Sequence, residues 1–230
     1  MQKSLDIPAP PARVGAALLA VASLTVMANA TIAPALPGLR QTFGDVAQAT
    51  TLVGLVMTLP SLFIVLTAAV SGVCVDRFGR RPVMLAGLLL YGIAGASGAF
   101  VDSLPAMLIG RAFLGAGNGA LMTAAIAMIG DLYQGQAREQ FVGIQGATLS
   151  GSAVLFMVTG GLLAEFSWRY PFLAYASALA MVPVVWTMLP ETLPARIAGQ
   201  APSTDRLPVA TLAVLGPIAF LAMVAFYLVP

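Results

Sequence analysis

Residues 72–82, GVCVDRFGRRP, place four charged side chains within six positions, between two long apolar stretches. Only 9% of the 230 residues are charged, whereas 59% are hydrophobic and the mean hydropathy is +0.93. Soluble domains carry roughly 25% charged and about 45–50% apolar residues. The composition therefore excludes an ordinary soluble domain. A charge cluster of this kind is expected where the chain leaves an apolar environment.

Seven apolar stretches approach or exceed the ~20 residues with which a helix crosses the hydrocarbon layer. Membrane β-strands are shorter and alternate apolar with polar residues, which these stretches do not. The sequence therefore predicts an all-α membrane protein with seven transmembrane helices. They are expected at Val14–Leu36, Thr50–Val73, Pro82–Val101, Leu104–Ile129, Phe141–Leu163, Pro171–Leu189 and Pro208–Val229.

The residue inventory argues against enzyme chemistry. Cys74 is the only cysteine and there is no histidine, so the chain offers no cluster of metal ligands and no histidine base. The glycines of GAGNGA at 115–120 have the wrong spacing for a phosphate-binding loop, and close helix packing explains them better. We expect no catalytic residues, no metal, no cofactor and no nucleic-acid partner.

The positive charges predict an orientation. With the N-terminus in the cytoplasm, eight Lys and Arg side chains fall on the inner side and two on the outer side, while Arg111 falls inside a span. This asymmetry follows the positive-inside rule. We therefore expect a multi-pass protein of the cell membrane, in a bacterium the inner membrane, with a cytoplasmic N-terminus.

A repeat emerges when the sequence is shifted against itself by 89 positions. The shift brings Asn29 onto Asn118 and preserves the pattern G-x3-[DE]-x3-R-x-P, matching Gly72, Asp76, Arg80 and Pro82 with Gly161, Glu165, Arg169 and Pro171. Each copy contains three spans, an odd number, so the second copy crosses the membrane in the opposite sense. Inverted repeats of this kind are typical of secondary transporters, with the solute site between the copies.

Several motifs resemble those of the major facilitator superfamily. GVCVDRFGRRP is similar to its loop 2–3 signature, and the similarity extends to NATIAPALP at 29–37, Arg111 with GAGNGA, DLYQGQAR at 131–138, EFSWRYPF at 165–172 and PETLP at 190–194. The resemblance implies secondary active transport by alternating access, with export of drug-like or small organic solutes. Thr159 departs from the pattern of drug antiporters, which have a proline before the closing glycines of the fifth helix.

The resemblance also implies a domain plan. Residues 1–13 form a cytoplasmic tail, 14–189 a six-helix N-terminal bundle of two inverted three-helix repeats, 190–207 a cytoplasmic linker, and 208–230 a seventh helix. Family members usually have twelve or fourteen spans. Three alternatives follow: a truncated chain whose partner is its own C-terminal half, a half-carrier that dimerises with a second copy, or a non-transporting module that binds a partner.

By resemblance, the loop 2–3 cluster latches the two halves of the transporter. Gly72 is expected to allow close helix approach, Asp76 to face the N-terminus of another helix, and the arginines to reach Asp131 or lipid phosphate. The full set of predicted latch residues is Gly72, Asp76, Arg77, Gly79, Arg80, Arg81, Asp131 and Arg138.

Polar residues inside the spans are candidates for a solute or proton pathway. Arg111 lies about 10 Å into its span, where an arginine costs ~2.5–3.5 kcal/mol, so we interpret it as functional; the alternative is that it extends to the outer headgroups. Asn118 lies two turns further on the same face. Gln145 and Ser152 belong to a polar stripe of the fifth span, although such hydroxyls often bond to their own helix. The resemblance adds Asn29.

Proton coupling stays open at this point. No Asp or Glu falls in the centre of any span, although proton-coupled carriers generally need a buried titratable group. Either the coupling acid lies outside these 230 residues, or the protein is not coupled to protons.

Overall fold

The structure, a computed structural model, describes residues 10–44 and 48–192, and within these ranges it is helical with no strand. The predicted seventh helix at 208–230 and all but the start of the predicted linker lie outside the described residues. The helices are α1 (Ala12–Ala30), α2 (Leu36–Thr42), α3 (Ala49–Phe78), α4 (Arg80–Ser97), α5 (Leu104–Leu132), α6 (Gly135–Phe166), α7 (Tyr170–Leu173) and α8 (Ser177–Met188), with 3₁₀ turns at Ala33–Ala35 and Ala174–Ala176.

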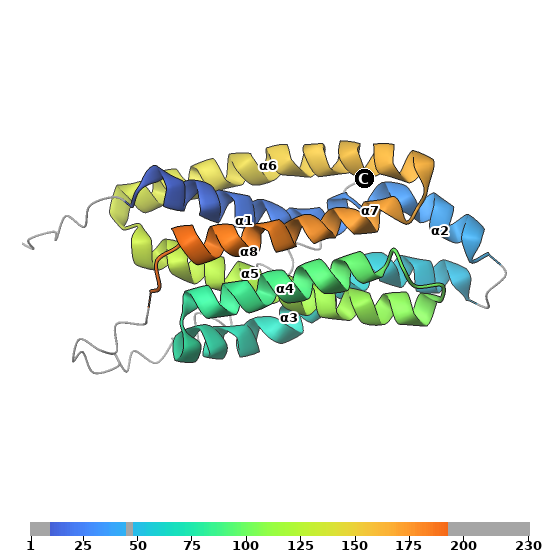
Figure 1. Ribbon diagram of the computed structural model, residues 1–230, viewed down its shortest axis with the longest axis horizontal. Coiled ribbons are helices and arrows are strands. Elements are labelled where there is room, and N and C mark those ends of the chain that lie inside the picture. The colour runs from blue at the N-terminus through green and yellow to red at the C-terminus, as the bar shows by residue number, and fades with distance from the viewer. Residues whose placement is uncertain (1–9, 45–47, 193–230) are drawn as a thin grey trace, which may run out of the picture. The chain divides into compact units, whose positions relative to one another are not determined.

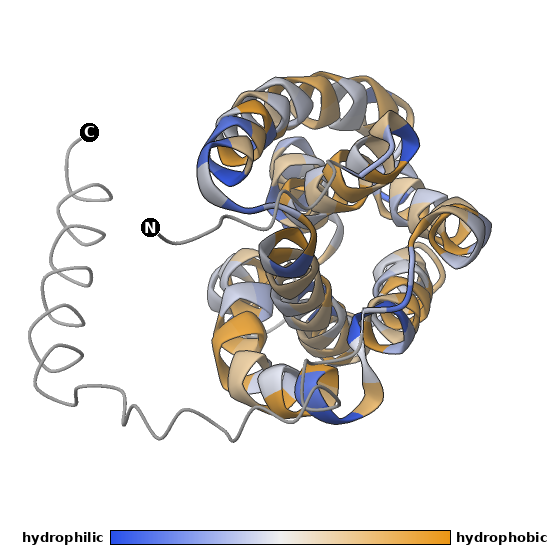
Figure 2. Cartoon of the chain, turned by 90° about the vertical axis from the view of Figure 1, so that its left-hand side faces the viewer, coloured by the Kyte–Doolittle hydropathy of each residue, from blue (hydrophilic) through white to orange (hydrophobic). Residues whose placement is uncertain are grey.

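The helices run side by side as an elongated bundle (Figure 1). Five segments are long and apolar enough to cross a membrane: Ala12–Thr42, Ala49–Phe78, Leu104–Leu132, Gly135–Phe166 and Tyr170–Met188. The shorter α4 begins with two arginines and packs beside α5 and α8. Apolar residues also cover outward faces of the bundle, as expected for a multi-pass membrane protein (Figure 2).

The helix bounds agree with the 89-residue repeat. The shift carries 49–78 onto 138–167, close to α6, and 80–97 onto 169–186, close to α7 and α8. The α3–α4 and α6–α7 junctions lie at opposite ends of the bundle (Figure 1). The two groups of helices are therefore threaded in opposite senses, as the odd number of spans per copy predicts.

The first span is broken rather than continuous. Helix α1 ends at Ala30, a 3₁₀ turn covers Ala33–Ala35, and α2 begins at Leu36. Pro34 has no N–H to bond the carbonyl of Ala30, and Pro37 likewise offers none to Ala33. The prolines of NATIAPALP thus explain the break, and they leave carbonyls of the last turn of α1 open to other donors.

Helix α5 lies at the centre of the bundle because its glycines let other helices approach. An added Cβ at Gly115 would lie 2.4 Å from the Pro60 carbonyl oxygen of α3, and one at Gly117 would lie 2.8 Å from the Tyr91 nitrogen of α4. Either distance requires backbone to move. Close helix packing, predicted for GAGNGA, is confirmed.

Two glycines of the loop 2–3 signature behave differently. Gly79 alone separates α3 from α4, with φ 95° and ψ 167°, a conformation essentially restricted to glycine. Gly72 has nothing within 4 Å of a Cβ position among the described residues. The close approach expected at Gly72 is therefore wrong for the described helices, because α3 turns this position outward.

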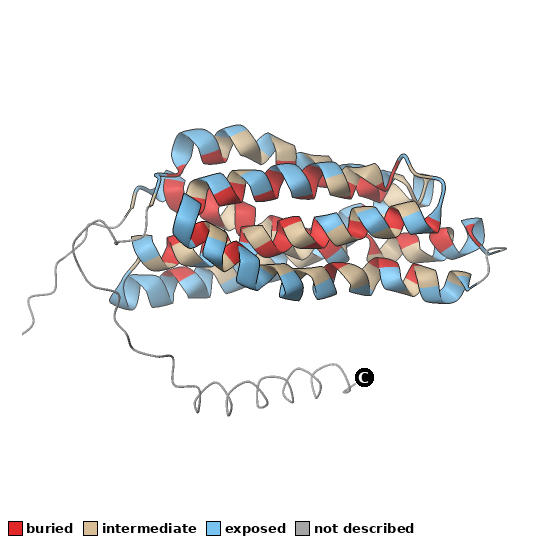
Figure 3. Ribbon diagram, turned by 90° about the horizontal axis from the view of Figure 1, so that it is seen from below, coloured by how far each residue is buried: buried red, intermediate tan, exposed pale blue. Residues whose placement is uncertain are grey.

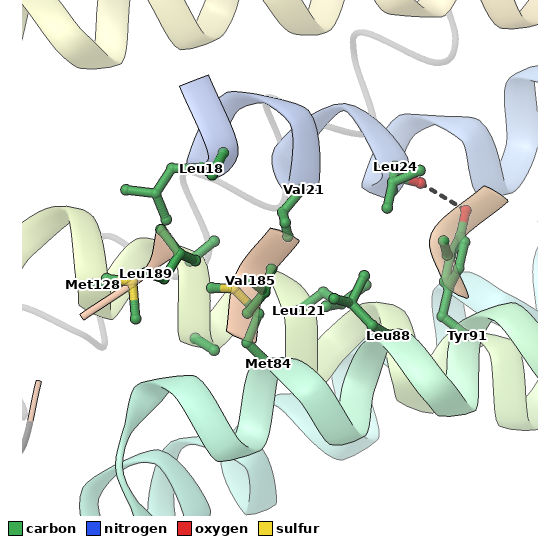
Figure 4. Close-up of a cluster of buried hydrophobic side chains, with 14 of the residues drawn as sticks. Leu18, Val21, Leu24, Met84, Leu88, Tyr91, Leu121, Met128, Val185 and Leu189 are labelled. Carbon is green, nitrogen blue, oxygen red and sulfur yellow. Dashed lines mark hydrogen bonds between the residues drawn. The ribbon is translucent and has the colours of Figure 1, made fainter. Parts of the chain in front are cut away.

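The core fills the space between α1, α4, α5 and α8, where large apolar side chains such as Leu18, Met84, Leu121 and Val185 interlock (Figure 4). The helices differ in how much of their surface is exposed (Figure 3). On α6 only Phe141 and Gly160 are buried. The core thus packs α1 against α4 and α5, and most residues of α6 stay outside it.

Candidate functional site

Three side chains from three different elements donate hydrogen bonds to the backbone of α1 just before its break. Tyr91 of α4 bonds the Leu24 carbonyl at 2.6 Å (Figure 4). Asn118 Nδ2 of α5 bonds the Thr25 carbonyl at 3.1 Å. In the turn before α8, Tyr175 bonds the Ala28 carbonyl at 2.8 Å. The last two turns of α1 are therefore held by the rest of the bundle.

Arg111 joins this arrangement from α5. Its Nη1 lies 3.1 Å from the hydroxyl oxygen of Tyr175, and its guanidinium carbon lies 4.5 Å from the ring centre of Phe172 and 4.9 Å from that of Tyr175. Only 2% of the residue is exposed, so it does not extend to the headgroups. Aromatic faces attract a desolvated cation. Nη2 has no hydrogen-bond partner among the described residues.

Gly95 of α4 and Gly98, which directly follows α4, leave room for the two rings beside Arg111. A Cβ at Gly98 would lie 1.9 Å from the Phe172 ring, and one at Gly95 would lie 2.5 Å from Cβ of Tyr175. No larger residue fits at either position without moving an aromatic side chain. The position of the Arg111 charge therefore depends on small residues in and directly after α4, the helix that packs beside α5.

A cavity of about 420 Å³ lies between α1, α5 and α6. Its wall is mostly apolar, with polar groups supplied by Thr25, Gln145 and Arg138. Asn118 is not a lining residue, but it lies one turn before Met122 on α5 and donates a hydrogen bond to the carbonyl of Thr25, which lines the wall. The lining residues are Ala22, Thr25, Met122, Ala125, Ile126, Ile129, Arg138, Val142, Gln145, Gly146 and Leu149.

The structure separates the five predicted pathway residues into four groups. Arg111 and Asn118 are buried inside the bundle, and Gln145 lines the cavity. Ser152 joins α6 to α1 through a 2.9 Å bond with Ser23, rather than bonding only its own helix. Asn29 is exposed, on the same face of α1 as Ala22 and Thr25 by helical spacing, and so does not meet Arg111.

The predicted latch residues also divide. Arg80 is buried and its Nε lies 2.7 Å from Asp131 Oδ2 at the end of α5. Asp76 is 74% exposed, 3.9 Å from Arg80, and meets no helix N-terminus in the described part. Arg80 thus carries the contact between the loop 2–3 signature and α5.

Of the three neighbouring arginines, only Arg80 reaches Asp131. Arg81 turns to α8, where it donates to the Trp186 carbonyl and lies 4.7 Å from the centre of its indole. Arg77 is exposed and lies 5.5 Å from the Phe78 ring. Arg138 is exposed at the cavity. Arg77 and Arg81 do not reach Asp131, so for these two arginines the other expected partner, lipid phosphate, stays a prediction.

The α5–α6 turn closes the same end of the bundle. Tyr133 stacks on Phe141 with ring centres 4.3 Å apart, and its hydroxyl lies close to Gly15 of α1. Desolvation raises the pKa of the Tyr133 phenol above its ordinary value. This hydroxyl therefore stays neutral across the physiological range.

Three functional candidates were missed in the sequence: Tyr91, Phe172 and Tyr175. For two of them the sequence did contain an indication, since Phe172 and Tyr175 are three residues apart and therefore share a helix face. In a chain with 16 Phe and Tyr residues, however, spacing alone does not indicate which aromatic faces a buried cation.

A bundle of long apolar helices, with a broken first span and a buried arginine, defines a multi-pass membrane protein. The model of the Major Facilitator Superfamily matches residues 18–230. The chain belongs to this superfamily.

Curated relatives include a resistance protein and an exporter. The chain is 35% identical over 159 residues to the tetracycline resistance protein, class C, of Escherichia coli, covering 69% of this chain and 40% of that protein. It is 30% identical over 164 residues to the bacillibactin exporter of Bacillus subtilis, covering 68% of this chain and 40% of that protein. The aligned part of the chain thus spans well under half the length of these relatives.

A solved structure shows the same fold. The inward-open xylose transporter XylE from E. coli aligns with a TM-score of 0.69 at 20% identity, covering 78% of this chain and 48% of that one. At this identity the likeness concerns the fold.

Proposed function

We propose that this chain forms the N-terminal bundle of a secondary active transporter that exports drug-like or small organic solutes by alternating access. The observation that carries the proposal is the cavity between α1, α5 and α6. An apolar wall with a few polar groups suits a small amphipathic molecule. The relatives named as an exporter and a resistance protein support export over import.

Solute contacts in this proposal come from Gln145 and Arg138 on α6, with Thr25 and Asn29 on the matching face of α1. Gln145 supplies both a donor and an acceptor, and Arg138 supplies a cation at one end of the cavity. Met122 adds a side chain that adapts to different apolar shapes. These contacts would bind loosely defined solutes rather than one rigid substrate.

Arg111 acts here as a positioning residue for span one. Its guanidinium holds Tyr175, and Tyr175 in turn bonds the Ala28 carbonyl beside the break of α1. Asn118 bonds α1 three residues earlier, next to the cavity. If α1 shifts when the transporter changes from outward-open to inward-open, these hydrogen bonds must break and new ones must form. The arrangement therefore links the cavity wall to the conformation of the transporter.

The latch proposal rests on Arg80. Its contact with Asp131 ties the α3–α4 turn to the end of α5, at the end of the bundle that we propose is cytoplasmic. Asp76 and Arg138, both exposed, remain available to groups outside the described residues. In our proposal the broad exposed face of α6, together with the exposed part of α3 that precedes Val70, is covered by a C-terminal half or by a second copy.

Proton coupling in this scheme requires a carboxylate from elsewhere in the protein. Within residues 10–44 and 48–192 every acidic side chain is exposed and lies near a helix end or in a connection: Asp76, Asp102, Asp131, Glu139, Glu165 and Glu191. None is placed in the middle of a span, where a coupling group would bind and release its proton.

Vesicle transport tests the proposal. Inside-out membrane vesicles containing the protein with its complete native chain are assayed with a panel of apolar dyes of different charge, with and without an imposed pH gradient. The proposal expects uptake above that of vesicles lacking the protein, and a marked loss in Ala125→Trp, which fills the cavity. Uptake that is equal with and without the protein, or unchanged by Ala125→Trp while the variant stays folded, contradicts it.

A further inference from the structure

A second apolar hollow lies between α3 and α4, on the other side of α5 from the cavity described above. Both helices pack along α5 but touch one another at few points, so they diverge and leave a groove whose floor is Ala120. We call it the α3–α4 groove. Its volume is about 400 Å³, and it is lined by Val70, Ser71, Cys74, Phe78, Pro82, Val83, Ala86, Gly87, Leu90 and Ala120.

The groove opens to the outside of the bundle. Val70 is 63% exposed and Phe78 is 58% exposed. Between these two residues α3 rises about 12 Å, in a helix with 1.5 Å per residue. An apolar channel of this length, open along a membrane-facing helix, matches a segment of a flexible hydrocarbon chain.

A cation lies at the end of the groove. Arg77 is three residues from Cys74 and seven from Val70, which places it on the same face of α3. Its guanidinium carbon lies 5.5 Å from the centre of the Phe78 ring, which lines the groove. No ion pair holds Arg77 within the described ranges, whereas Arg80 is held by Asp131 and the Arg81 guanidinium lies over Trp186.

We propose that the α3–α4 groove binds an anionic phospholipid, with one acyl chain in the groove and the phosphate on Arg77. Burial of apolar surface favours the chain, and a planar guanidinium favours the phosphate. The carboxylate of Asp76 does not oppose this, because it lies toward Arg80 on the neighbouring side. An apolar helix of another protein segment would fill the groove without needing the cation at its end.

Cys74 provides the readout, since it lies in the groove, is partly exposed and is the only cysteine of the 230 residues. The maleimide labelling rate of the purified protein is measured in detergent with added dioleoylphosphatidylglycerol or dioleoylphosphatidylcholine. We expect both lipids to slow labelling, with the anionic lipid half-protecting at a concentration about fivefold lower. Equal half-protecting concentrations would overturn the proposal.

Matched variants separate the charge from the groove. Arg77→Gln is expected to remove the preference for phosphatidylglycerol, whereas Arg13→Gln, which removes an exposed arginine in the first turn of α1, keeps it. A preference retained in Arg77→Gln overturns the role of that cation. Circular dichroism and a monodisperse elution profile confirm that each variant is folded.

Lipid counting gives a second readout that does not depend on labelling. Ala86→Trp narrows the groove, and native mass spectrometry should show fewer phosphatidylglycerol molecules retained than on the wild type. An unchanged count contradicts the proposed acyl-chain site. Protection of Cys74 that rises with protein concentration but not with lipid concentration identifies a second copy as the occupant, and likewise overturns the proposal.

Discussion

Arg111 donates a hydrogen bond of 3.1 Å to the hydroxyl of Tyr175, and the same guanidinium lies 4.9 Å from the centre of the Tyr175 ring. One aromatic residue thus meets the buried cation through both its oxygen and its π face. Carboxylates are exposed throughout the described part of the chain, so the charge is stabilised by rings and a hydroxyl instead of a counter-ion. Because the hydroxyl also bonds Ala28, this stabilisation is tied to the position of span one.

Arg111→Lys tests whether the planar guanidinium is required. Lysine keeps the charge but has no flat group that stacks on Phe172 and hydrogen-bonds Tyr175 together. We expect efflux to fall at least about tenfold, since the lost bond to a charged donor corresponds to about 1.5–3 kcal/mol. Dye efflux from cells measures the effect. Arg40→Lys, at an exposed position of α2, is the control, and wild-type efflux in Arg111→Lys would contradict the assigned role.

Tyr175→Phe removes only the hydroxyl. The ring stays over the guanidinium, but the bond to the Ala28 carbonyl and the bond accepted from Arg111 are both lost at a buried position. Because one of the two bonds involves a charged donor, we expect the free energy of unfolding to fall by about 1.5–3 kcal/mol. Tyr170→Phe, at an exposed residue, should change it by less than about 0.5 kcal/mol. Thermal unfolding of the two variants in the same detergent compares them directly, and equal midpoints would refute the contribution of these bonds.

The sequence predicted the helical membrane class, the repeat and the packing of GAGNGA, because each depends on local composition or on spacing. Gly79 illustrates why: it lies between Asp76–Arg77 and Arg80–Arg81, a charged stretch that marks a turn, and the turn needs a glycine conformation. The direction of Arg81 toward Trp186 could not be predicted, because the two are 105 residues apart and only the folded bundle joins them.

Asn29 and Asn118 show the same limit within the repeat. They match at the 89-residue shift, yet Asn118 is buried against the Thr25 carbonyl while Asn29 is exposed. The repeat fixes which helix and which depth each residue occupies. It does not fix which neighbour covers it, because α5 is packed on several sides and α1 is left open on one face.

Gly115→Ala and Gly54→Ala form a matched pair of identical chemical changes. At Gly115 the new methyl group would meet the backbone of Pro60 at 2.4 Å, so α3 and α5 must separate. We expect a loss of about 1–3 kcal/mol in the free energy of unfolding. At Gly54 nothing lies within 4 Å among the described residues, and alanine favours the helix by roughly 0.5–1 kcal/mol. Chemical denaturation of both variants measures the difference, and equal destabilisation would contradict the packing.

The ion pairs at the two ends of the bundle should differ in strength. Arg80 is 8% exposed beside Asp131 at 33%, whereas Arg169 and Asp102 are 34% and 85% exposed. A double-mutant cycle with Arg169→Gln and Asp102→Asn should give a coupling free energy of about 0.2–1 kcal/mol. The cycle with Arg80→Gln and Asp131→Asn should give a larger coupling free energy, and this energy should depend less on the salt concentration. The reverse order would show that solvent exposure does not govern these contacts.

Arg138→Gln distinguishes solutes by charge. Arg138 lies at the cavity without an ion-pair partner in residues 10–44 and 48–192, so its charge is free to attract an anionic solute. Removing the charge should raise the KM for anionic dyes by roughly two- to fivefold, which corresponds to the free energy of one exposed ion pair. The KM for neutral dyes should not change. The wild-type preference should also weaken as salt is added. Arg13→Gln controls for the general charge of this end of the bundle. If neutral and anionic dyes lose affinity equally in Arg138→Gln, the side chain shapes the cavity rather than supplying its charge, because only a charge contact separates the two dye classes.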